Sequence, residues 1–205
     1  MYFEYGNEET TLLKKKDRLL GSAIEQIGHI HREVDSNLFT SVIRHIIGQQ
    51  ISTSAQKTIW QRLVDKIGVV NVKTISELGL NELQKVGLTH KKVGYIKDFA
   101  LKIKNDEFDI HSLHRLPDDA VIEKLTAIRG IGNWTAEMVM LFGMQRPDIV
   151  SFGDLGIRRG MKMLYRLSDI DSEQFAKYKK RYSPYGSVAS LYLWAIAGGA
   201  IPDGL

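Results

Sequence analysis

The stretch that decides the fold is Leu125–Ala136, with the sequence LTAIRGIGNWTA. Two glycines, Gly130 and Gly132, flank one aliphatic residue, and this spacing allows the backbone a tight turn between two helices. Ile131 is expected to plug between those helices. The aliphatic residues expected to pack beneath the turn are Leu125, Ile128 and Val139. The stretch therefore predicts a helical hairpin.

The turn of this hairpin has the chemistry of a phosphate-binding site. Backbone N–H groups at the start of the second helix lack partners within the helix, and they attract a phosphate oxygen without any base contact. The residues predicted to grip a nucleic-acid backbone in this way are Gly130, Ile131, Gly132, Asn133 and Thr135. The alternative is a helix–turn–helix corner that binds no ligand, which many helical proteins contain.

The rest of the chain also has helical periodicity, with short connections and just four prolines. The predicted helical segments are Asp17–Gly28, a helix capped by Asn37 that runs towards Gln50, a helix capped by Ser52 or Ser54 that Gly68 ends, Ser76–Val86, His90–Ile103, Pro117–Ile128, Asn133–Phe142, Leu155–Leu167 and Ser172–Ala197. One segment, Val69–Thr74, suggests a brief strand. The fold class predicted is all-α.

Composition excludes several classes of site. The 205 residues suit one large domain or two small ones, and 43% apolar with 25% charged residues is ordinary for a globular protein. Cysteine is absent, which excludes disulfides, thiol nucleophiles, thiolate metal sites and a cysteine-ligated iron–sulfur cluster. The sequence has no transmembrane stretch and no signal-peptide pattern, so a cytoplasmic protein without a membrane partner is expected. No heptad pattern indicates a dimer, and a monomer is expected.

Charge permits a polyanionic partner. The 28 basic and 24 acidic residues give a net charge of +4, and the pI is near 9.1. Basic residues cluster at Lys14–Arg18, His90–Lys92 and Lys177–Arg181. Each cluster alone is interpreted as a solvated helix face. The charge distribution is therefore compatible with a nucleic-acid partner but does not by itself indicate one.

Several stretches of the sequence resemble the motifs of a known family. Leu125–Ala136 resembles the helix–hairpin–helix of the DNA glycosylase superfamily that is named for this hairpin, a Gly/Pro-rich loop and an aspartate. The remaining parts of that signature follow in order as Gly143, Pro147 and Phe152–Gly156. Within the superfamily, Gly132–Ala136 is closest to the alkylation-repair branch, the 3-methyladenine DNA glycosylase II group. Ile46–Ser52 and Lys179–Trp194 are similar to other motifs of that branch, and the likeness runs from roughly Leu38 to Trp194.

The resemblance implies a two-part fold in one unit that spans residues 1–205. It implies a helical barrel subdomain at about 38–110 and a region with the hairpin and the aspartate at about 111–205, with an active-site cleft between the two. The N-terminal helix is a candidate to join the second region. The missing cysteine loop argues against the endonuclease III-like branches, and the length leaves no room for the extra β-rich domain of some relatives. The chain therefore resembles the compact form.

Asp154 is the candidate catalytic residue. It directly precedes the predicted helix Leu155–Leu167, and alone it is best interpreted as a helix N-cap. The resemblance implies catalysis, and both roles can coexist because a helix N-terminus favours an ionised carboxylate. A fixed anion stabilises the positive charge that builds on the sugar as an N-glycosidic bond breaks. The same carboxylate can orient or deprotonate the attacking water.

Trp134 indicates which reaction the family resemblance implies. Members that also cut the DNA strand carry a lysine nucleophile there, and tryptophan cannot act in that way. The resemblance therefore implies a monofunctional enzyme that leaves an abasic site. An indole can also stack on a flipped base that carries positive charge, although a core tryptophan is an equal alternative. The residues implied to form the base pocket are Trp134, Trp194, Tyr192 and Met138.

Further contacts with DNA are implied by the same resemblance. Gln50 would enter the duplex as a wedge, while Gln49 would contact the opposite strand or brace the loop; a polar turn is the alternative for both. The basic residues suited to phosphate contacts are Lys91, Lys92, Arg158 and Arg159. The backbone carbonyls implied to hold a Na⁺ or K⁺ ion against a phosphate are those of Thr126, Ile128 and Ile131. The six histidines have no metal-ligand spacing, so no catalytic metal is expected. Apart from the Na⁺ or K⁺ ion, no cofactor is expected.

The leading hypothesis is a DNA glycosylase of base excision repair that flips and hydrolyses alkylated purines, of the 3-methyladenine and 7-methylguanine type, out of double-stranded DNA. Alkylation of a ring nitrogen already improves the leaving group, which fits the lack of an obvious general acid beside Asp154. Two alternatives stay open. One is a glycosylase for another lesion, such as hypoxanthine or uracil, and the other is a non-catalytic DNA-binding module for distorted duplex.

Overall fold

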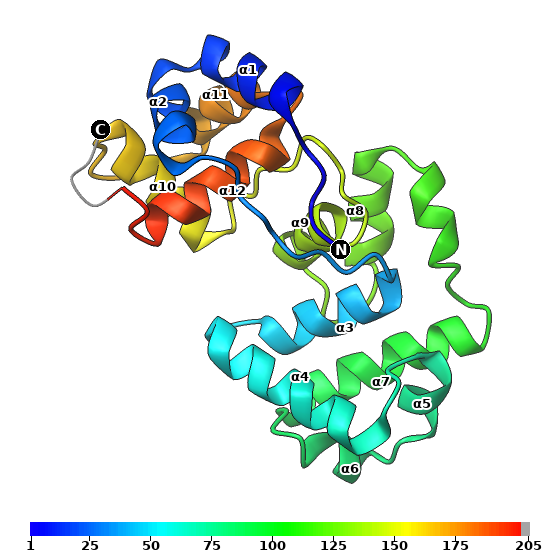
Figure 1. Cartoon of the computed structure of the whole chain (residues 1–205). Coiled ribbons are helices and arrows are strands. Elements are labelled where there is room, and N and C mark those ends of the chain that lie inside the picture. Colours follow the sequence, from blue (N-terminus) through cyan, green and yellow to red (C-terminus); the bar gives the residue numbers. More distant parts are fainter. Residues whose placement is uncertain (202–205) are drawn as a thin grey trace. The chain divides into compact units, whose positions relative to one another are not determined.

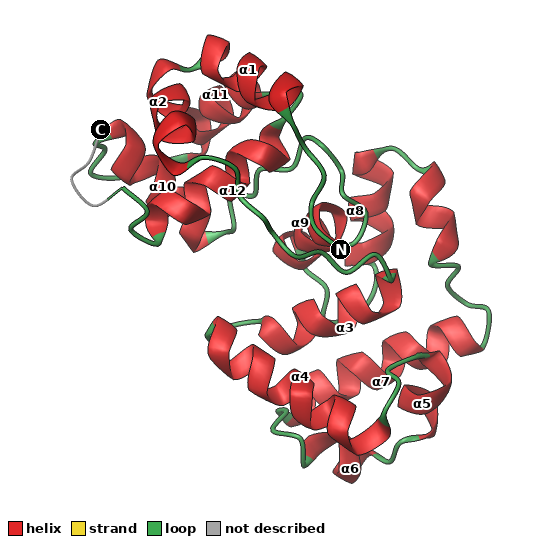
Figure 2. Cartoon of the chain, in the orientation of Figure 1, coloured by secondary structure: helices red, strands yellow, loops and turns green. Residues whose placement is uncertain are grey.

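The computed structural model describes residues Met1–Ile201, and within them the chain is all-α, as predicted (Figures 1 and 2). This described part holds twelve α-helices and one 3₁₀ helix. It contains no named strand, and its extended pairing is limited to one isolated bridge between Tyr2 and Glu33. The last four residues of the expected range, 202–205, lie outside the described part of the chain.

The chain divides into two compact units. The first unit joins Met1–Val34 to the chain from Gln145 onward, and the second unit is Asp35–Met144. The division thus falls after the hairpin, and not near residue 110 as expected from the resemblance. The reason is packing, because the second helix of the hairpin contacts the first long helix of the second unit. The N-terminal helices belong with the C-terminal region.

The first unit is built around two long helices that lie against each other. Its helices are α1 (Asn7–Lys16), α2 (Arg18–Ile27), α10 (Leu155–Tyr165), α11 (Ser172–Tyr182) and α12 (Gly186–Ala197). α10 packs along α12, and α2 contacts both. A Cβ added at Gly160 of α10 would stand 2.1 Å from the carbonyl oxygen of Leu193 in α12. Glycine is therefore required at this crossing, because no larger residue permits so close an approach.

The second unit contains seven α-helices and the 3₁₀ helix among its residues. They are α3 (Leu38–Gly48), α4 (Thr53–Ile67), α5 (Val72–Glu77), α6 (Leu80–Gln84), α7 (His90–Lys104), η1 (His111–Arg115), α8 (Asp118–Thr126) and α9 (Asn133–Phe142). α3 is the central element, because it contacts α4, α7 and α9. Phe39 of α3 and Phe99 of α7 stack with their ring centroids 5.5 Å apart, and both are buried. This core supports the two loops that are predicted to contact DNA.

Three predicted helix boundaries are confirmed by their caps. The side chain of Asn37 accepts the N–H of Thr40 at the start of α3. The side chain of Ser52, and not that of Ser54, accepts the N–H of Ala55 at the start of α4. Gly68 ends α4. Polar caps of this kind satisfy N–H groups that a helix leaves unpaired at its N-terminus.

Other boundaries differ from the prediction. Val69–Thr74 forms no strand, because Asn71 and Thr74 make a capping box that starts α5. Ser76–Val86 is not one helix, since Leu78 is extended and Gly79 is the N-cap of α6. The long segment Ser172–Ala197 is two helices, separated where Ser183–Pro184 interrupts the hydrogen bonding. Helix α1 was not predicted at all.

Candidate functional site

Asp154 is held in a fixed orientation at the start of α10. Its Oδ1 accepts the N–H of Ile157 at 2.9 Å, which makes it the N-cap of the helix. The same oxygen accepts the indole Nε1–H of Trp194 in α12, also at 2.9 Å. Asp154 is 9% exposed. The capping role is thus present, and the two donors hold Oδ1 of the carboxylate in place.

Arg32, which the sequence does not mark as a site residue, lies beside this carboxylate. Its guanidinium carbon stands 5.9 Å from the centroid of the Trp194 ring. Arg32 is exposed as a whole residue, yet its guanidinium is surrounded closely enough that burial lowers the pKa of Arg32. The negative charges of Glu33 and Asp154 act on this pKa in the opposite direction. A lone arginine in an irregular segment after α2 gives no signal in the sequence.

The four residues implied to form the base pocket differ in burial. Trp134, on the first turn of α9, and Trp194 are half-buried. Tyr192 is instead 1% exposed, and its hydroxyl donates to the carbonyl oxygen of Gly28 at 3.0 Å. Met138 is 2% exposed within α9. The structure thus places Tyr192 and Met138 in the cores of their units, because helical spacing on an apolar helix buries them.

The hairpin has the predicted packing. Ile131 is buried between α8 and α9, and Leu125, Ile128 and Val139 are buried as well. The N–H of Ile131 donates to the carbonyl of Ile128 at 3.1 Å and closes the turn. Gly130 has a φ of 88°, a conformation that favours glycine. Gly132 and Asn133 are exposed at the start of α9, as a contact with a phosphate requires.

Gln49 braces the loop between α3 and α4 against this hairpin. Its Nε2 donates to the carbonyl oxygen of Gly130 and to Oγ1 of Thr135, each at 2.9 Å. The Thr135 hydroxyl is therefore engaged inside the protein, and its side chain is buried. Gln50 is exposed and has a φ of 56°. Of the two roles weighed for Gln49, this geometry favours the brace.

The predicted basic contacts are not equivalent. Lys91 is exposed on the first turn of α7. Lys92 donates through Nζ to the carbonyls of Ile47 and Gln49, at 2.8 and 2.6 Å, and burial lowers its pKa. Lys92 is thus occupied within the protein, which corrects the interpretation of its side chain as a phosphate contact. Arg158 lies 4.9 Å from the centroid of the Phe152 ring, while Arg159 is exposed.

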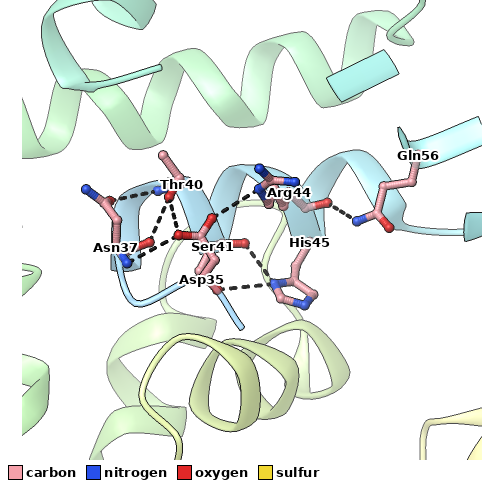
Figure 3. A network of polar contacts seen from close by, with 7 residues as sticks. All are labelled: Asp35, Asn37, Thr40, Ser41, Arg44, His45 and Gln56. Carbon is pink, nitrogen blue, oxygen red and sulfur yellow. Dashed lines mark hydrogen bonds and ion pairs between the residues drawn. The ribbon is translucent and has the colours of Figure 1, made fainter. Parts of the chain in front are cut away.

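A polar network runs along α3 and connects it to α4 (Figure 3). Asp35 accepts the Thr40 hydroxyl at 2.8 Å, and its other oxygen lies 3.0 Å from Nε of Arg44. The Arg44 guanidinium also lies over the ring of Trp60, 3.7 Å from its centroid. On the far side of the loop, Nε2 of Gln56 donates to the carbonyl of Arg44 at 2.6 Å. These contacts hold α3 and α4 at a set distance on either side of the loop that carries Gln50.

The hairpin turn is compatible with the expected monovalent cation. The Ile128 carbonyl, which accepts the N–H of Ile131, keeps a second lone pair for another partner, as any carbonyl does. A role for the carbonyls of Thr126, Ile128 and Ile131 in binding such an ion stays a prediction. Within residues 1–201 there is no group of three or more His, Asp or Glu side chains suited to a metal ion. No helix in that range has both the length and the apolar character needed to cross a membrane.

Comparisons with known proteins agree with the geometry. Residues 43–184 match the model of the HhH-GPD superfamily of base excision DNA repair proteins. The crystal structure of a DNA-3-methyladenine glycosidase from Bacillus halodurans superposes with a TM-score of 0.84 at 33% identity, over 100% of this chain and 95% of that one. A 3-methyladenine DNA glycosylase from Schizosaccharomyces pombe, solved in complex with abasic DNA, superposes with a TM-score of 0.79 at 25% identity, over 92% and 96%.

A curated relative extends beyond this chain. It is a putative DNA-3-methyladenine glycosylase from Bacillus subtilis, 29% identical over 170 residues. The match covers 78% of this chain and 59% of the relative. The chain thus spans less than two thirds of the length of that protein.

Proposed function

Because the chain belongs to the HhH-GPD superfamily of base excision DNA repair proteins, we propose that it is a monofunctional DNA glycosylase that removes alkylated purines from double-stranded DNA. The substrates proposed are bases of the 3-methyladenine and 7-methylguanine type, and the product is an abasic site. The observation that carries the proposal is the Asp154 carboxylate, which two N–H donors hold at the start of α10.

Asp154 acts on the sugar in this proposal. Loss of the base leaves positive charge on the sugar ring, and a preorganised carboxylate stabilises that charge without any reorganisation. The donors Ile157 and Trp194 hold the carboxylate in place, so that it also directs a water molecule to the sugar. Little general acid catalysis is required, because an alkylated purine is already a good leaving group.

The aromatic residues supply selectivity. An indole is proposed to contact the flipped base, since its π-face attracts a positively charged ring. The two candidates are Trp194, which donates to Asp154, and Trp134, on the first turn of α9. Tyr192 and Met138 are not proposed to contact the base, because both are buried. Trp134 has no amine for attack on the sugar, and this supports hydrolysis without strand cleavage.

The DNA is held mainly through its backbone. The exposed N–H groups around Gly132 and Asn133 are proposed to bind a phosphate, with Lys91 as a second phosphate contact. Gln50 is proposed to enter the duplex where the flipped nucleotide leaves a gap. We propose a monomer as the active form.

The test is release of free bases from duplex DNA treated with dimethyl sulfate, measured by chromatography. The wild type should release methylpurines, and Asp154→Asn should lower the single-turnover rate by about 100-fold or more. Asp171→Asn is the matched control, because Asp171 caps α11 in the same way through the N–H of Gln174. Asparagine also caps helices, so both variants should fold.

The outcomes separate the hypotheses. Release by the wild type and by Asp171→Asn alone supports the glycosylase and the role of Asp154. Release that survives Asp154→Asn contradicts that role. If no variant releases methylpurines, the same assay on duplexes with hypoxanthine or uracil separates a glycosylase for another lesion from a module that only binds DNA.

A further inference from the structure

One lysine and one glutamine connect the two parts of the second unit that are proposed to touch DNA. The wedge loop, Gly48–Ser52, carries Gln50, and the hairpin turn, Ile128–Gly132, presents the N–H groups for a phosphate. Gln49 donates from the wedge loop to Gly130 and Thr135, each at 2.9 Å. Lys92 of α7 donates to the carbonyls of Ile47 and Gln49. The wedge loop is thus held from two sides by side chains distant in sequence.

Helix α7 contacts both the wedge loop and the hairpin turn from the same face. Lys92 and Tyr95 are three residues apart and therefore lie on one side of the helix. A Cβ added at Gly130 would stand 2.2 Å from the ring of Tyr95, so Tyr95 lies directly against the hairpin turn. The Arg129 guanidinium lies 5.5 Å from the centroid of the same ring. One turn of α7 thus fixes the wedge loop through Lys92 and the hairpin turn through Tyr95.

The ends of the wedge loop are anchored as well. Gln56 of α4 reaches back to the carbonyl of Arg44 in α3, as Figure 3 shows. A Cβ at Gly48 would stand 2.6 Å from Nε2 of Gln56, so the two segments are in close contact. Between these anchors Gln50 has a φ of 56°, which a residue with a side chain adopts only at some cost. Such a conformation persists only when the surrounding structure holds it, as the anchored ends of the wedge loop do here.

We propose that Lys92 and Gln49 are positioning residues that lock the wedge loop to the hairpin turn, so that binding of a DNA phosphate by the turn sets the depth at which Gln50 enters the duplex. This inference rests on the proposed function. Its physical basis is that contacts remote from the reacting bond supply free energy for distortion of the substrate. That transfer requires a rigid connection, because a loose loop would let the hairpin bind phosphate without insertion of Gln50.

Lys97 provides a matched control for Lys92. It lies on the same helix and donates through Nζ to the carbonyls of Ile75, Ser76 and Leu78. Burial lowers the pKa of both lysines. Each variant, Lys92→Met or Lys97→Met, therefore removes an ammonium group that donates to main-chain carbonyls. The variants differ in which segment loses this contact. Any general loss of stability should be similar in the two variants.

The first experiment measures insertion directly. The probe is a duplex with a tetrahydrofuran analogue of an abasic site and 2-aminopurine opposite, whose fluorescence reports the loss of stacking. Lys92→Met and Gln49→Ala should each lower the insertion rate by about tenfold or more, because displacement of a positioned group by about 1 Å has effects of that size. Affinity for undamaged duplex should change less than insertion does, and Lys97→Met should insert like the wild type.

The second experiment uses the full chain without DNA. Amide hydrogen exchange in Lys92→Met and in Gln49→Ala should rise in both the wedge loop and the hairpin turn, whereas Lys97→Met should raise exchange only near the end of α5. This readout does not depend on the lesion or on catalysis. It also detects a variant that has lost its fold, since exchange would then rise throughout the second unit.

Several outcomes overturn the inference. Equal insertion rates for Lys92→Met and Lys97→Met would overturn it. Faster amide hydrogen exchange confined to the wedge loop would overturn it as well. A wild type that leaves the fluorescence unchanged also overturns it, because no insertion then exists to be positioned. Insertion by the wild type with no base release from methylated DNA refutes the proposed glycosylase, while the comparison of the two lysine variants still decides the lock.

Discussion

At the scale of single residues, Asp154 shows that a helix cap and a candidate catalytic group can be one carboxylate. Its Oδ1 receives one donor from its own helix and one from Trp194 in another helix. The first donor is what any N-cap aspartate obtains, and the second is specific to this site. The indole N–H therefore distinguishes Asp154 from an ordinary cap, and its removal tests whether that contact serves the reaction.

Trp194→Phe should slow base release more than it weakens DNA binding. The substitution keeps an aromatic ring and removes the Nε1–H that donates to Asp154. A hydrogen bond to a charged group contributes about 1.5–3 kcal/mol, which corresponds to roughly 10- to 100-fold in rate if it is lost from the transition state. The measurement is the single-turnover rate on methylated duplex beside the dissociation constant for an abasic duplex. An unchanged rate would mean that Trp194 only packs against the site.

Lys91 and Lys92 are neighbours in sequence, yet their substitutions should have different effects on the salt dependence of DNA binding. Lys91→Met should lower the slope of log K against log salt by about 0.9, because each neutralised phosphate releases counterions. Lys92→Met should leave the slope unchanged, because its ammonium already donates to the carbonyls of Ile47 and Gln49. Binding titrations on one duplex at several salt concentrations give both slopes. Equal slopes for the two variants would contradict this assignment.

At the scale of helices, the contact between α10 and α12 brings Asp154 and Trp194 together. Gly160→Ala should lower the free energy of unfolding by about 2 kcal/mol or more, since overpacking of a tight contact has that cost. The added Cβ would stand 2.1 Å from the Leu193 carbonyl, so the helices must separate. The same shift should lengthen the bond between Asp154 and Trp194 and lower the rate of base release.

A second glycine serves as the control for Gly160. Gly94 lies in α7, and a Cβ added there would meet no atom within 4 Å. Gly94→Ala should therefore raise the free energy of unfolding by about 0.5–1 kcal/mol, because alanine has the higher helix propensity. Denaturant unfolding of both variants checks the pair. A loss of stability in Gly94→Ala would show that the contrast does not come from packing at the helix crossing.

The helices that the sequence predicted well are those with strong local signals. Asn133–Phe142 has the predicted bounds, and the caps Asn37 and Ser52 act as expected. The failures have tertiary causes. Ser76–Val86 breaks into two helices where Lys97, from α7, binds the carbonyls that the first helix leaves unpaired. No pattern within the segment itself contains that partner.

At the scale of the whole chain, the candidate site could be predicted only where one motif carries it. The hairpin and Asp154 lie in continuous stretches with recognisable spacing. Arg32, by contrast, comes from the other end of the chain, and the first unit is assembled from both ends. The roles of Gln49 and Lys92 within the second unit likewise depend on contacts with distant segments. Local periodicity cannot predict partners of this kind.

This assembly of the first unit from two separated segments predicts that Asp17 is important for stability. Asp17 is 3% exposed and caps α2 through the N–H of Leu20. Its Oδ2 also accepts the hydroxyl of Tyr165 and Nη1 of Arg181, each at 2.7 Å. The N-terminal helices are therefore joined to α10 and α11 through one buried carboxylate. This interaction closes a long stretch of chain, so its loss should affect the whole unit.

Asp17→Asn should lower the free energy of unfolding by about 2 kcal/mol, which is below the 3–5 kcal/mol for a broken buried ion pair because Arg181 is partly exposed and solvent screens it. Asparagine keeps the cap on α2, so the change isolates the charge. Asp171→Asn removes a capping carboxylate that is exposed, and it should change stability by less than about 0.5 kcal/mol. Urea unfolding of the two variants, with hydrogen exchange to locate the loss, makes the comparison. Equal stability of the two would mean that helix packing alone joins the ends of the chain, and that the buried carboxylate adds nothing beyond its cap.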